Sequence, residues 1–208
     1  MAQAGLSVLL IDADLRKPVQ HSIFNLPSSH HGLTSMLVQL KMEDLEAEPE
    51  QFYRYAFRLG QPSSLTILPC GKIPPNPSET LGTRKMKRFL KWAETQFDVI
   101  MIDTPPVLAV TDSLVVGSYV DKAILVVEAG STKKKELERT ITRLKDANVN
   151  VMGLVVNQSQ SPDQYYYYYG SEEALKEDVL DVSEPQSTND RVAPERVAQE
   201  RVTVIETN

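Results

Sequence analysis

Several features are scarce or missing in this sequence, and each narrows the class of protein. Cys70 is the only cysteine, which excludes an internal disulfide and fits a reducing compartment. No run approaches the roughly 18 apolar residues that a membrane span needs, and no signal peptide is recognisable, so we expect a soluble chain. Basic residues are not in excess, with 22 Lys and Arg against 28 Asp and Glu, which disfavours a nucleic-acid-binding domain.

The nine glycines do not form the phosphate-binding loop GxxxxGK[ST]; the segment Gly130 to Lys133 has the residue types in another order. Gly5 follows small residues and directly precedes an apolar run, as does a glycine that ends a helix. A buried parallel strand normally belongs to a βαβ unit. We therefore expect the chain to begin inside an element, with a strand, the phosphate loop and most of a helix upstream. A true start with a frayed end is the alternative.

The charge is concentrated at the C-terminal end. Ten of the 28 acidic residues and four of the 22 basic residues follow Gly170, which accounts for the whole net charge of -6. This stretch has few large apolar side chains and a short repeat that begins Arg-Val, and such a composition buries too little surface to offset its ordering entropy. We expect a folded domain over 1–158, a tyrosine cluster over 159–170 and a disordered acidic tail over 171–208.

Within the predicted domain, short apolar runs alternate with helical patterns. This alternation predicts a doubly wound, mainly parallel α/β sheet. The expected strands are 6–11, 65–68, 98–103, 122–127 and 149–156, and the expected helices are 35–40, 45–59, 78–96, 113–119 and 133–147.

Two of these strands end on acidic residues. Asp12 and Asp14 follow the first run, and Asp103 ends the run Val99 to Ile102. Ligands of open parallel sheets bind beyond the carboxyl ends of the strands. Neighbouring strands would bring the three carboxylates together there, a set that suits a hydrated Mg²⁺ on a nucleotide phosphate. The alternative is that these acids only cap loops and helices.

Basic residues follow the first acid pair. Arg16 and Lys17 would hold phosphate oxygens or balance the acids, unless they belong to a solvated turn. Asp112 is expected to cap a helix rather than to bind a ligand.

The most unusual stretch is a run of five consecutive tyrosines. Its members are Tyr165, Tyr166, Tyr167, Tyr168 and Tyr169. In a polar setting these are accessible hydroxyls that suit phosphoryl transfer, and each phosphate would add about 1.5 to 2 negative charges. A partner-docking surface is the alternative, and the two are compatible.

Taken together, five segments resemble the bacterial tyrosine kinases of capsular and exopolysaccharide synthesis: VLLIDADLRKP (8–18), LPCGKIPPNPSETL (68–81), FDVIMIDTPPVLAVTD (97–112), GLVVN (153–157) and YYYYYG (165–170). The resemblance covers about residues 2–170. It implies a P-loop NTPase-like fold of the deviant-Walker type, here N-terminally truncated because the Walker A segment is missing.

The resemblance also implies roles for individual residues. Asp12 and Asp14 would lie in Walker A′, with Asp12 near Mg²⁺ and the acceptor hydroxyl and Asp14 supporting the metal and its waters. Asp103 of Walker B would bind Mg²⁺ through water, and Asn157 would contact the adenine. All five tyrosines of the run 165–169 would be autophosphorylation sites, modified between subunits of a ring-like homo-oligomer.

As a whole, the resemblance predicts a non-specific protein-tyrosine kinase that uses ATP and Mg²⁺. Its expected partners are its own subunits, a membrane polysaccharide co-polymerase that is fused or separate, and a cognate tyrosine phosphatase, with no nucleic acid. We expect it in the cytoplasm, peripheral to the inner face of the membrane. Without Walker A, the chain alone should have little or no kinase activity. The alternatives are a deviant-Walker partitioning ATPase and a non-catalytic phosphoacceptor or adaptor module.

Overall fold

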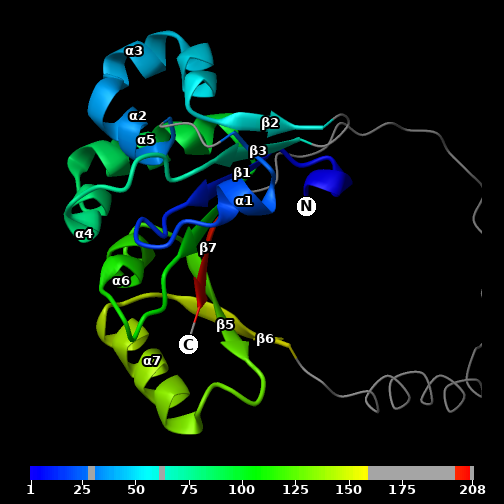
Figure 1. The fold of residues 1–208 in the computed structure, drawn as a ribbon, viewed down its shortest axis with the longest axis vertical. Helices are drawn as coiled ribbons and strands as arrows, with labels where there is room; N and C mark the ends of the chain where they lie inside the picture. Colours follow the sequence, from blue (N-terminus) through cyan, green and yellow to red (C-terminus); the bar gives the residue numbers. More distant parts are fainter. Residues whose placement is uncertain (28–30, 61–63, 159–199, 207–208) are drawn as a thin grey trace, which may run out of the picture.

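The fold is described from a computed structural model, which describes residues 1–27, 31–60, 64–158 and 200–206. Seven strands form one sheet in the order β2-β3-β1-β4-β7-β5-β6 (Figure 1). All neighbouring pairs are parallel except β2 with β3, which confirms the predicted mainly parallel sheet. The strands are β1 (Val8–Asp12), β2 (Phe57–Leu59), β3 (Leu65–Leu68), β4 (Val99–Thr104), β5 (Lys122–Glu128), β6 (Val151–Asn157) and β7 (Glu200–Glu206).

Helical elements connect the strands. The α-helices are α1 (Gln20–Ile23), α2 (Leu33–Gln39), α3 (Met42–Ala47), α4 (Pro77–Leu81), α5 (Arg84–Gln96), α6 (Asp112–Gly117) and α7 (Lys134–Asp146), and two 3-10 helices span Ala2–Ala4 and Pro49–Arg54. Gly5 ends the first 3-10 helix with φ 89°, as its position before an apolar strand predicted. Among the described residues, no helix is long and apolar enough to cross a membrane.

The core has two parts. The larger part joins β1 and β4 to α2, α3 and α5, and it centres on Phe52, whose ring lies 5.9 Å from Phe89 and 5.2 Å from Trp92. The smaller part joins β5 to α7 through Leu125 and Leu144. Figure 1 shows the same division, with α2 to α5 in the upper half and α7 in the lower half.

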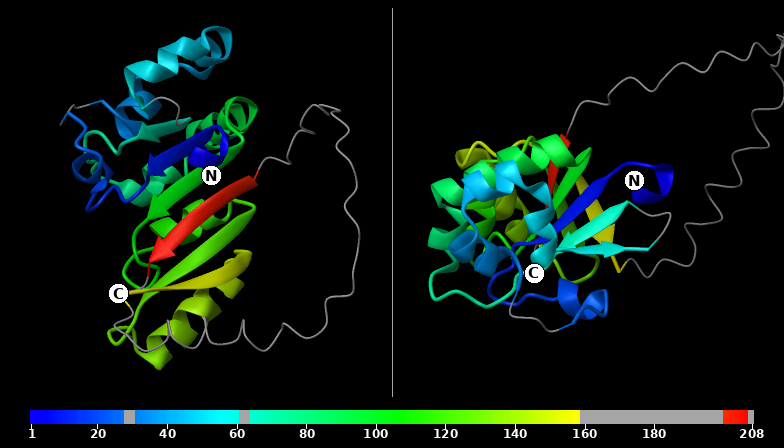
Figure 2. Two further views of the ribbon diagram at one scale, coloured as in Figure 1. Left: turned by 90° about the vertical axis from the view of Figure 1, so that its right-hand side faces the viewer. Right: turned by 90° about the horizontal axis from the view of Figure 1, so that it is seen from above.

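Helices cover the two sheet faces unequally. In the left view of Figure 2, β7, β5 and β6 lie in front of α7, and no described helix lies in front of them. β5 accordingly alternates between buried and partly exposed residues, and Met152, Leu154 and Val155 of β6 are exposed. The structure thus shows β5 and β6 covered by a described helix on one face only.

The loop between β3 and α4 packs against the start of α2. The Thr34 hydroxyl donates to the carbonyl oxygens of Cys70 and Lys72, at 3.1 and 2.6 Å. A Cβ atom on Gly32 would lie 2.4 Å from the Pro69 oxygen, so this close approach requires glycine. This packing orients the segment that leads to α4.

Three expected segments differ from the structure. The single helix predicted over 78–96 is two helices, because Thr83 caps a new helix by accepting from the Met86 N–H at 3.2 Å. The helix predicted over 45–59 ends early, and Phe57–Leu59 pairs with β3. The tail predicted to be disordered over 171–208 contains β7 at residues 200–206. The boundaries drawn at 158 and 170 stay predictions.

Candidate functional site

Asp12 and Asp103 lie side by side at the carboxyl edge of the sheet. β1 and β4 are adjacent and parallel, and their register pairs Asp12 with Asp103. The Ala13 N–H donates to the Asp103 carbonyl at 2.8 Å, which extends the pairing past the end of β1. The apolar strands thus bring these two carboxylates to the edge where such sheets bind ligands.

Gln20 connects the two acids. Its backbone N–H donates to Asp12 Oδ2 at 3.1 Å, and its side-chain Nε2 donates to Asp103 Oδ2 at 2.5 Å. Gln20 is the first residue of α1 and is buried. We did not predict this residue, and its sequence neighbourhood carries no signal that distinguishes it from a surface glutamine.

Asp12 is the most unusual carboxylate of the described residues. Its side chain is fully buried, and Oδ1 has no hydrogen-bond partner among the residues that the structure describes. Its pKa is raised from 3.8 to about 7, chiefly by burial and also by the nearby charges of Asp103 and Asp14, against the opposing hydrogen bond from Gln20. A buried acceptor without a donor is costly. Oδ1 therefore suits a cation or a donor supplied by a ligand.

Asp103 has a related environment. Burial raises its pKa, and the charge of Asp14 adds to that effect, while the hydrogen bond from Gln20 opposes it. Both neighbouring carboxyls are thus easier to protonate than in water. A bound cation would reverse this preference because it stabilises the ionised forms.

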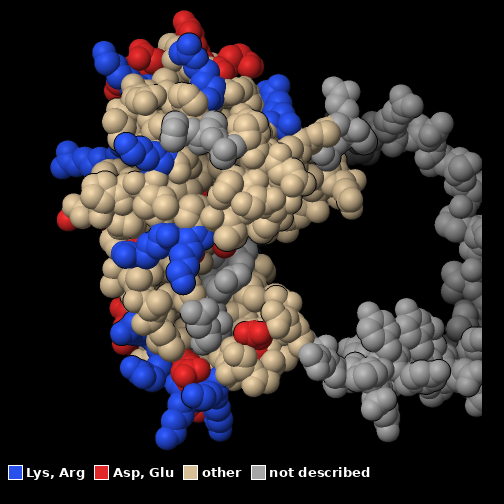
Figure 3. Space-filling view, viewed as in Figure 1, with Lys and Arg blue, Asp and Glu red and all other residues tan. Residues whose placement is uncertain are grey.

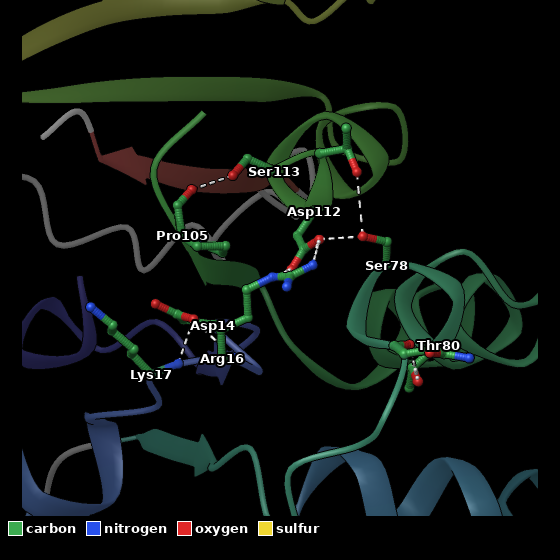
Figure 4. Close-up of polar contacts among 10 residues, drawn as sticks. Asp14, Arg16, Lys17, Ser78, Thr80, Pro105, Asp112 and Ser113 are labelled. Atoms are coloured by element: carbon green, nitrogen blue, oxygen red, sulfur yellow. Dashed lines mark hydrogen bonds and ion pairs between the residues drawn. The ribbon is translucent and has the colours of Figure 1, made fainter. Parts of the chain in front are cut away.

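Asp14 is turned toward its own loop. Its Oδ1 accepts the backbone N–H groups of Arg16 and Lys17, at 3.0 and 2.9 Å (Figure 4). Among residues 1–27, 31–60, 64–158 and 200–206, no group of three or more His, Cys, Asp or Glu is arranged to hold a metal ion. Asp14 thus shapes the turn after β1, and the metal role predicted for Asp12, Asp14 and Asp103 stays a prediction.

Arg16 forms a bidentate ion pair with Asp112. Its Nε and Nη2 atoms donate to Asp112 Oδ2 and Oδ1 at 2.8 and 3.1 Å, and the Ser78 hydroxyl also donates to Oδ1 (Figure 4). The Asp112 side chain is fully buried, whereas Arg16 is 42% exposed. The pKa of Arg16 is raised, chiefly by the hydrogen bonds to Asp112. The contact links the loop after β1 to the starts of α4 and α6.

This pairing changes the role expected for Asp112. The helix cap predicted for Asp112 is wrong: α6 begins at Asp112 itself, and Thr111 precedes it without a side-chain cap. The Arg16 Nη1 group makes no hydrogen bond or ion pair with the described residues. Asp112 thus holds one side of the guanidinium, through Nε and Nη2.

The remaining predicted binding residues lie farther from the acid pair. The Lys17 side chain is exposed and extends away from the Arg16–Asp112 pair in Figure 4. Asn157 ends β6 at the same edge of the sheet, but β7 and β5 separate β6 from β4, a spacing of about 14 Å at ~4.8 Å per strand. The register also places Asn157 four residues beyond Gly153, which is level with Asp103, so the separation is about 19 Å at ~3.3 Å per residue.

The predicted phosphoacceptors cannot be placed relative to this edge, because the whole tyrosine run lies outside the described residues. This applies to each of its members, Tyr165, Tyr166, Tyr167, Tyr168 and Tyr169. Their role as acceptors therefore stays a prediction.

Charges on the rest of the surface are mixed. Figure 3 shows Lys and Arg side chains spread over one face, with Asp and Glu among them at both ends, over α3 and α7. This distribution agrees with the sequence, in which basic and acidic residues balance up to Gly170. On this face, no large patch of a single sign competes with the acid edge for a charged ligand.

The donor set fits Mg²⁺ better than a softer metal. Mg²⁺ takes hard oxygen ligands, keeps several waters and usually needs only one or two carboxylates. Asp12 Oδ1 and the Asp103 carboxylate supply such oxygens. The one cysteine, Cys70, is buried, and its pKa is raised to about 12, first by burial and then by the charges of Asp12 and Asp14. It therefore stays a neutral thiol rather than the thiolate that a softer metal binds. The fold and these acids define a parallel α/β protein with a carboxylate pair at its ligand-binding edge.

Comparisons with known proteins identify the family. No protein-family model matches the chain. Tyrosine-protein kinase YwqD of Bacillus subtilis is 36% identical over 173 residues, which cover 83% of this chain and 68% of YwqD. The putative tyrosine-protein kinase CapB of Staphylococcus aureus is 34% identical over 173 residues, which cover 82% of this chain and 71% of CapB. The chain therefore belongs to the bacterial tyrosine kinases of the capsule and exopolysaccharide type.

Solved structures agree with this assignment. The kinase domain of Escherichia coli tyrosine kinase Etk matches with a TM-score of 0.65 at 33% identity, over 77% of this chain and 60% of that domain. The chimerical protein CapA2B2 matches with a TM-score of 0.68 at 30% identity, over 77% of this chain and 66% of its own. The predicted P-loop NTPase-like kinase fold is thus confirmed. Against the whole of tyrosine-protein kinase Etk, the match spans 20% of that protein's length.

Proposed function

We propose that the acid edge binds Mg²⁺ and ATP and directs phosphoryl transfer to tyrosine hydroxyls. The observation that carries this proposal is the buried, unpartnered Oδ1 of Asp12 beside Asp103. Mg²⁺, when bound, would neutralise phosphate charge. Asp12 and Asp103 would hold the ion, Asp103 through water, and Asp14 would support its water shell from the adjoining turn.

Asp12 also suits proton transfer from the acceptor. With the cation bound, the Asp12 carboxylate would stay ionised, and it would accept the proton of a tyrosine hydroxyl placed at the edge. Gln20 holds Oδ2, so the orientation of the carboxylate is fixed before a ligand binds.

Phosphate and base contacts would come from the residues around the acids. Arg16 would donate from the side of its guanidinium that faces away from Asp112, and Lys17 would supply a second cation. Asn157 lies at the same edge three strands away from Asp103, and it would contact the adenine. The five tyrosines of the run 165–169 would be the phosphoacceptors.

At the level of the cell, the proposal follows the family. The chain would act in a ring-like homo-oligomer at the inner face of the membrane, with a polysaccharide co-polymerase and a tyrosine phosphatase as partners. The sequence contains no GxxxxGK[ST] loop to hold the phosphates. We therefore propose that the chain alone transfers phosphate weakly or not at all, while it retains the magnesium acids and the acceptor tyrosines.

A phosphorylation experiment tests both halves of this proposal. The chain is incubated with Mg²⁺ and ATP, either alone or with active YwqD, and its phosphotyrosines are mapped by mass spectrometry. We expect little modification alone and phosphate on Tyr165 to Tyr169 with YwqD. If those tyrosines stay unmodified in both reactions, the acceptor role is refuted. Strong modification alone would refute the weak activity, and its persistence in Asp12→Asn would refute the catalytic role of Asp12.

A further inference from the structure

Gln20 contacts both acids of the edge from one position. Its backbone N–H donates to Asp12 Oδ2, and its side-chain amide donates to Asp103 Oδ2. The side-chain contact has a defined sense, because an ionised carboxylate only accepts hydrogen bonds and the amide Nε2 group only donates them. One residue therefore engages the Oδ2 atom of each carboxylate.

The position of Gln20 does not depend on the two acids alone. Gln20 is buried and begins α1, and its carbonyl oxygen accepts the Phe24 N–H at 3.0 Å. The turn before α1 is held by Asp14, whose Oδ1 accepts the Arg16 N–H, and the Arg16 side chain is held by Asp112. These contacts fix the direction from which the amide reaches the carboxylates.

The oxygens that a carboxylate leaves free affect which divalent cation it prefers. Ca²⁺ takes roughly six to eight oxygen ligands and often binds both oxygens of one carboxylate, whereas Mg²⁺ keeps several waters and usually needs one or two carboxylates. A carboxylate whose second oxygen already accepts from an N–H group is a poor two-oxygen ligand. It can still bind through its other oxygen, such as Asp12 Oδ1, which has no hydrogen-bond partner among the described residues.

We propose that Gln20 is a specificity-determining residue, which makes the acid edge select Mg²⁺ over Ca²⁺ by occupying Oδ2 of both Asp12 and Asp103. The proposal rests on the proposed function, because it requires a divalent cation at these acids. Gln20 does not bind the ion itself and acts through the two carboxylates. Replacing outer partners of this kind typically changes metal affinity by about 10- to 100-fold.

A purely structural role for Gln20 would give a different result. Loss of the amide would then weaken the fold, and the affinities for Mg²⁺ and Ca²⁺ would fall together. Loss of a selecting contact instead frees Asp103 Oδ2, an oxygen that Ca²⁺ can use, so the two affinities move apart. The ratio of the two affinities does not depend on the folded fraction, because both ions bind the same folded molecules.

Competition against Mn²⁺ measures this ratio on the intact chain. The chain is loaded with Mn²⁺, the free ion is followed by electron paramagnetic resonance, and Mg²⁺ or Ca²⁺ is added as the competitor. We expect the wild type to prefer Mg²⁺. Gln20→Met has a side chain of similar length without a donor, and it should lower the ratio of Mg²⁺ to Ca²⁺ affinity at least about tenfold. Gln20→Asn should lower the ratio too, because its shorter amide does not reach Asp103.

Ser22→Ala is the matched control. Ser22 lies on the same helix and is exposed, and its hydroxyl is hydrogen-bonded to His21 Nε2 at 3.1 Å rather than to either acid. This variant should keep the wild-type ratio.

The results separate this inference from the proposed function. If Mn²⁺ binds the wild type but not Asp12→Asn, and Gln20→Met shifts the ratio no more than Ser22→Ala does, the selecting role of Gln20 is refuted and the metal site stands. A wild type that prefers Ca²⁺ would refute the selecting role in the same way. If Mn²⁺ binds the wild type and Asp12→Asn equally, the metal site of the proposed function fails, and this inference fails with it.

Discussion

Replacing Asp12 by Asn should stabilise the metal-free chain, and the gain should grow with pH. In the unfolded chain Asp12 ionises near its ordinary pKa of 3.8, whereas in the fold its pKa is about 7 because the side chain is buried. Between these values the folded state holds a proton that the unfolded state has lost, so stability falls by about 1.4 kcal/mol for each rise of one pH unit. Below about pH 3 both states are protonated and the penalty vanishes; above about pH 8 both are ionised and it is constant.

The magnitude follows from the same two pKa values. Ionisation of Asp12 should cost the fold about 1 kcal/mol at pH 4.5 and about 4 kcal/mol at pH 7.5. Asparagine has no charge to desolvate, and its amide oxygen can still accept the Gln20 N–H that Asp12 Oδ2 accepts at 3.1 Å. Asp12→Asn should therefore exceed the wild type in free energy of unfolding by about these amounts.

Urea unfolding in the presence of a chelator measures this difference at the two pH values. Trp92, the single tryptophan, is 8% exposed and reports unfolding by fluorescence. Asp146→Asn, at the exposed end of α7, is the control and should change stability by less than about 0.5 kcal/mol. The reasoning is refuted if Asp12→Asn is no more stable than the wild type at pH 7.5, or if its advantage is the same at pH 4.5.

Further variants test the other contacts in the same urea assay. Millimolar Mg²⁺ should raise the free energy of unfolding of the wild type but not of Asp12→Asn, because the ion needs the ionised carboxylate. An equal increase in both proteins would mean that the ion binds elsewhere. Arg16→Ala should lower the free energy of unfolding by about 3 kcal/mol, because it leaves the buried Asp112 charge without its partner. Asp112→Asn should lower it by only about 1 kcal/mol, because water reaches the Arg16 guanidinium that is left unpaired. The reverse order would contradict the ion-pair account. Gly32→Ala should lower the free energy of unfolding by about 2 to 3 kcal/mol, because its Cβ would lie 2.4 Å from the Pro69 carbonyl oxygen. An unchanged stability would mean that the loop between β3 and α4 moves to accommodate the methyl group. Gln20→Ala should cost about 1 to 3 kcal/mol by leaving Asp103 Oδ2 without its donor, and wild-type stability would show the bridge to be dispensable.

The acid edge was predictable because its signal is local. An apolar run that ends on Asp12 or Asp103 identifies both a buried strand and the end at which ligands bind, and parallel pairing then places the two acids together. The contacts of Gln20 and Asp112 were not predictable in this way. Each depends on a partner that the fold brings near: Arg16 lies 96 positions before Asp112, and no short pattern records that distance.

Two strands, β2 and β7, were not predicted, and in both the local sequence pattern is too weak to identify a strand. β2 has only three residues, Phe57–Leu59, which are too few to show an alternating pattern after a stretch with a helical one. β7 lies in a polar, acidic stretch whose average composition predicts disorder, and only its pairing with both β4 and β5 makes it a strand. Such non-local pairing overrides local propensity, which is why composition alone missed this segment.

The central claim is that the carboxylates of Asp12 and Asp103 form a magnesium site at the edge of the sheet. Titration of the isotope-labelled chain with Mn²⁺, a paramagnetic substitute for Mg²⁺, tests it residue by residue in NMR spectra. We predict that the amide signals of Ala13, Gln20 and Thr104 broaden first, and that Asp12→Asn abolishes this broadening. Broadening that begins elsewhere in the chain, or that is the same in Asp12→Asn, would contradict the claim.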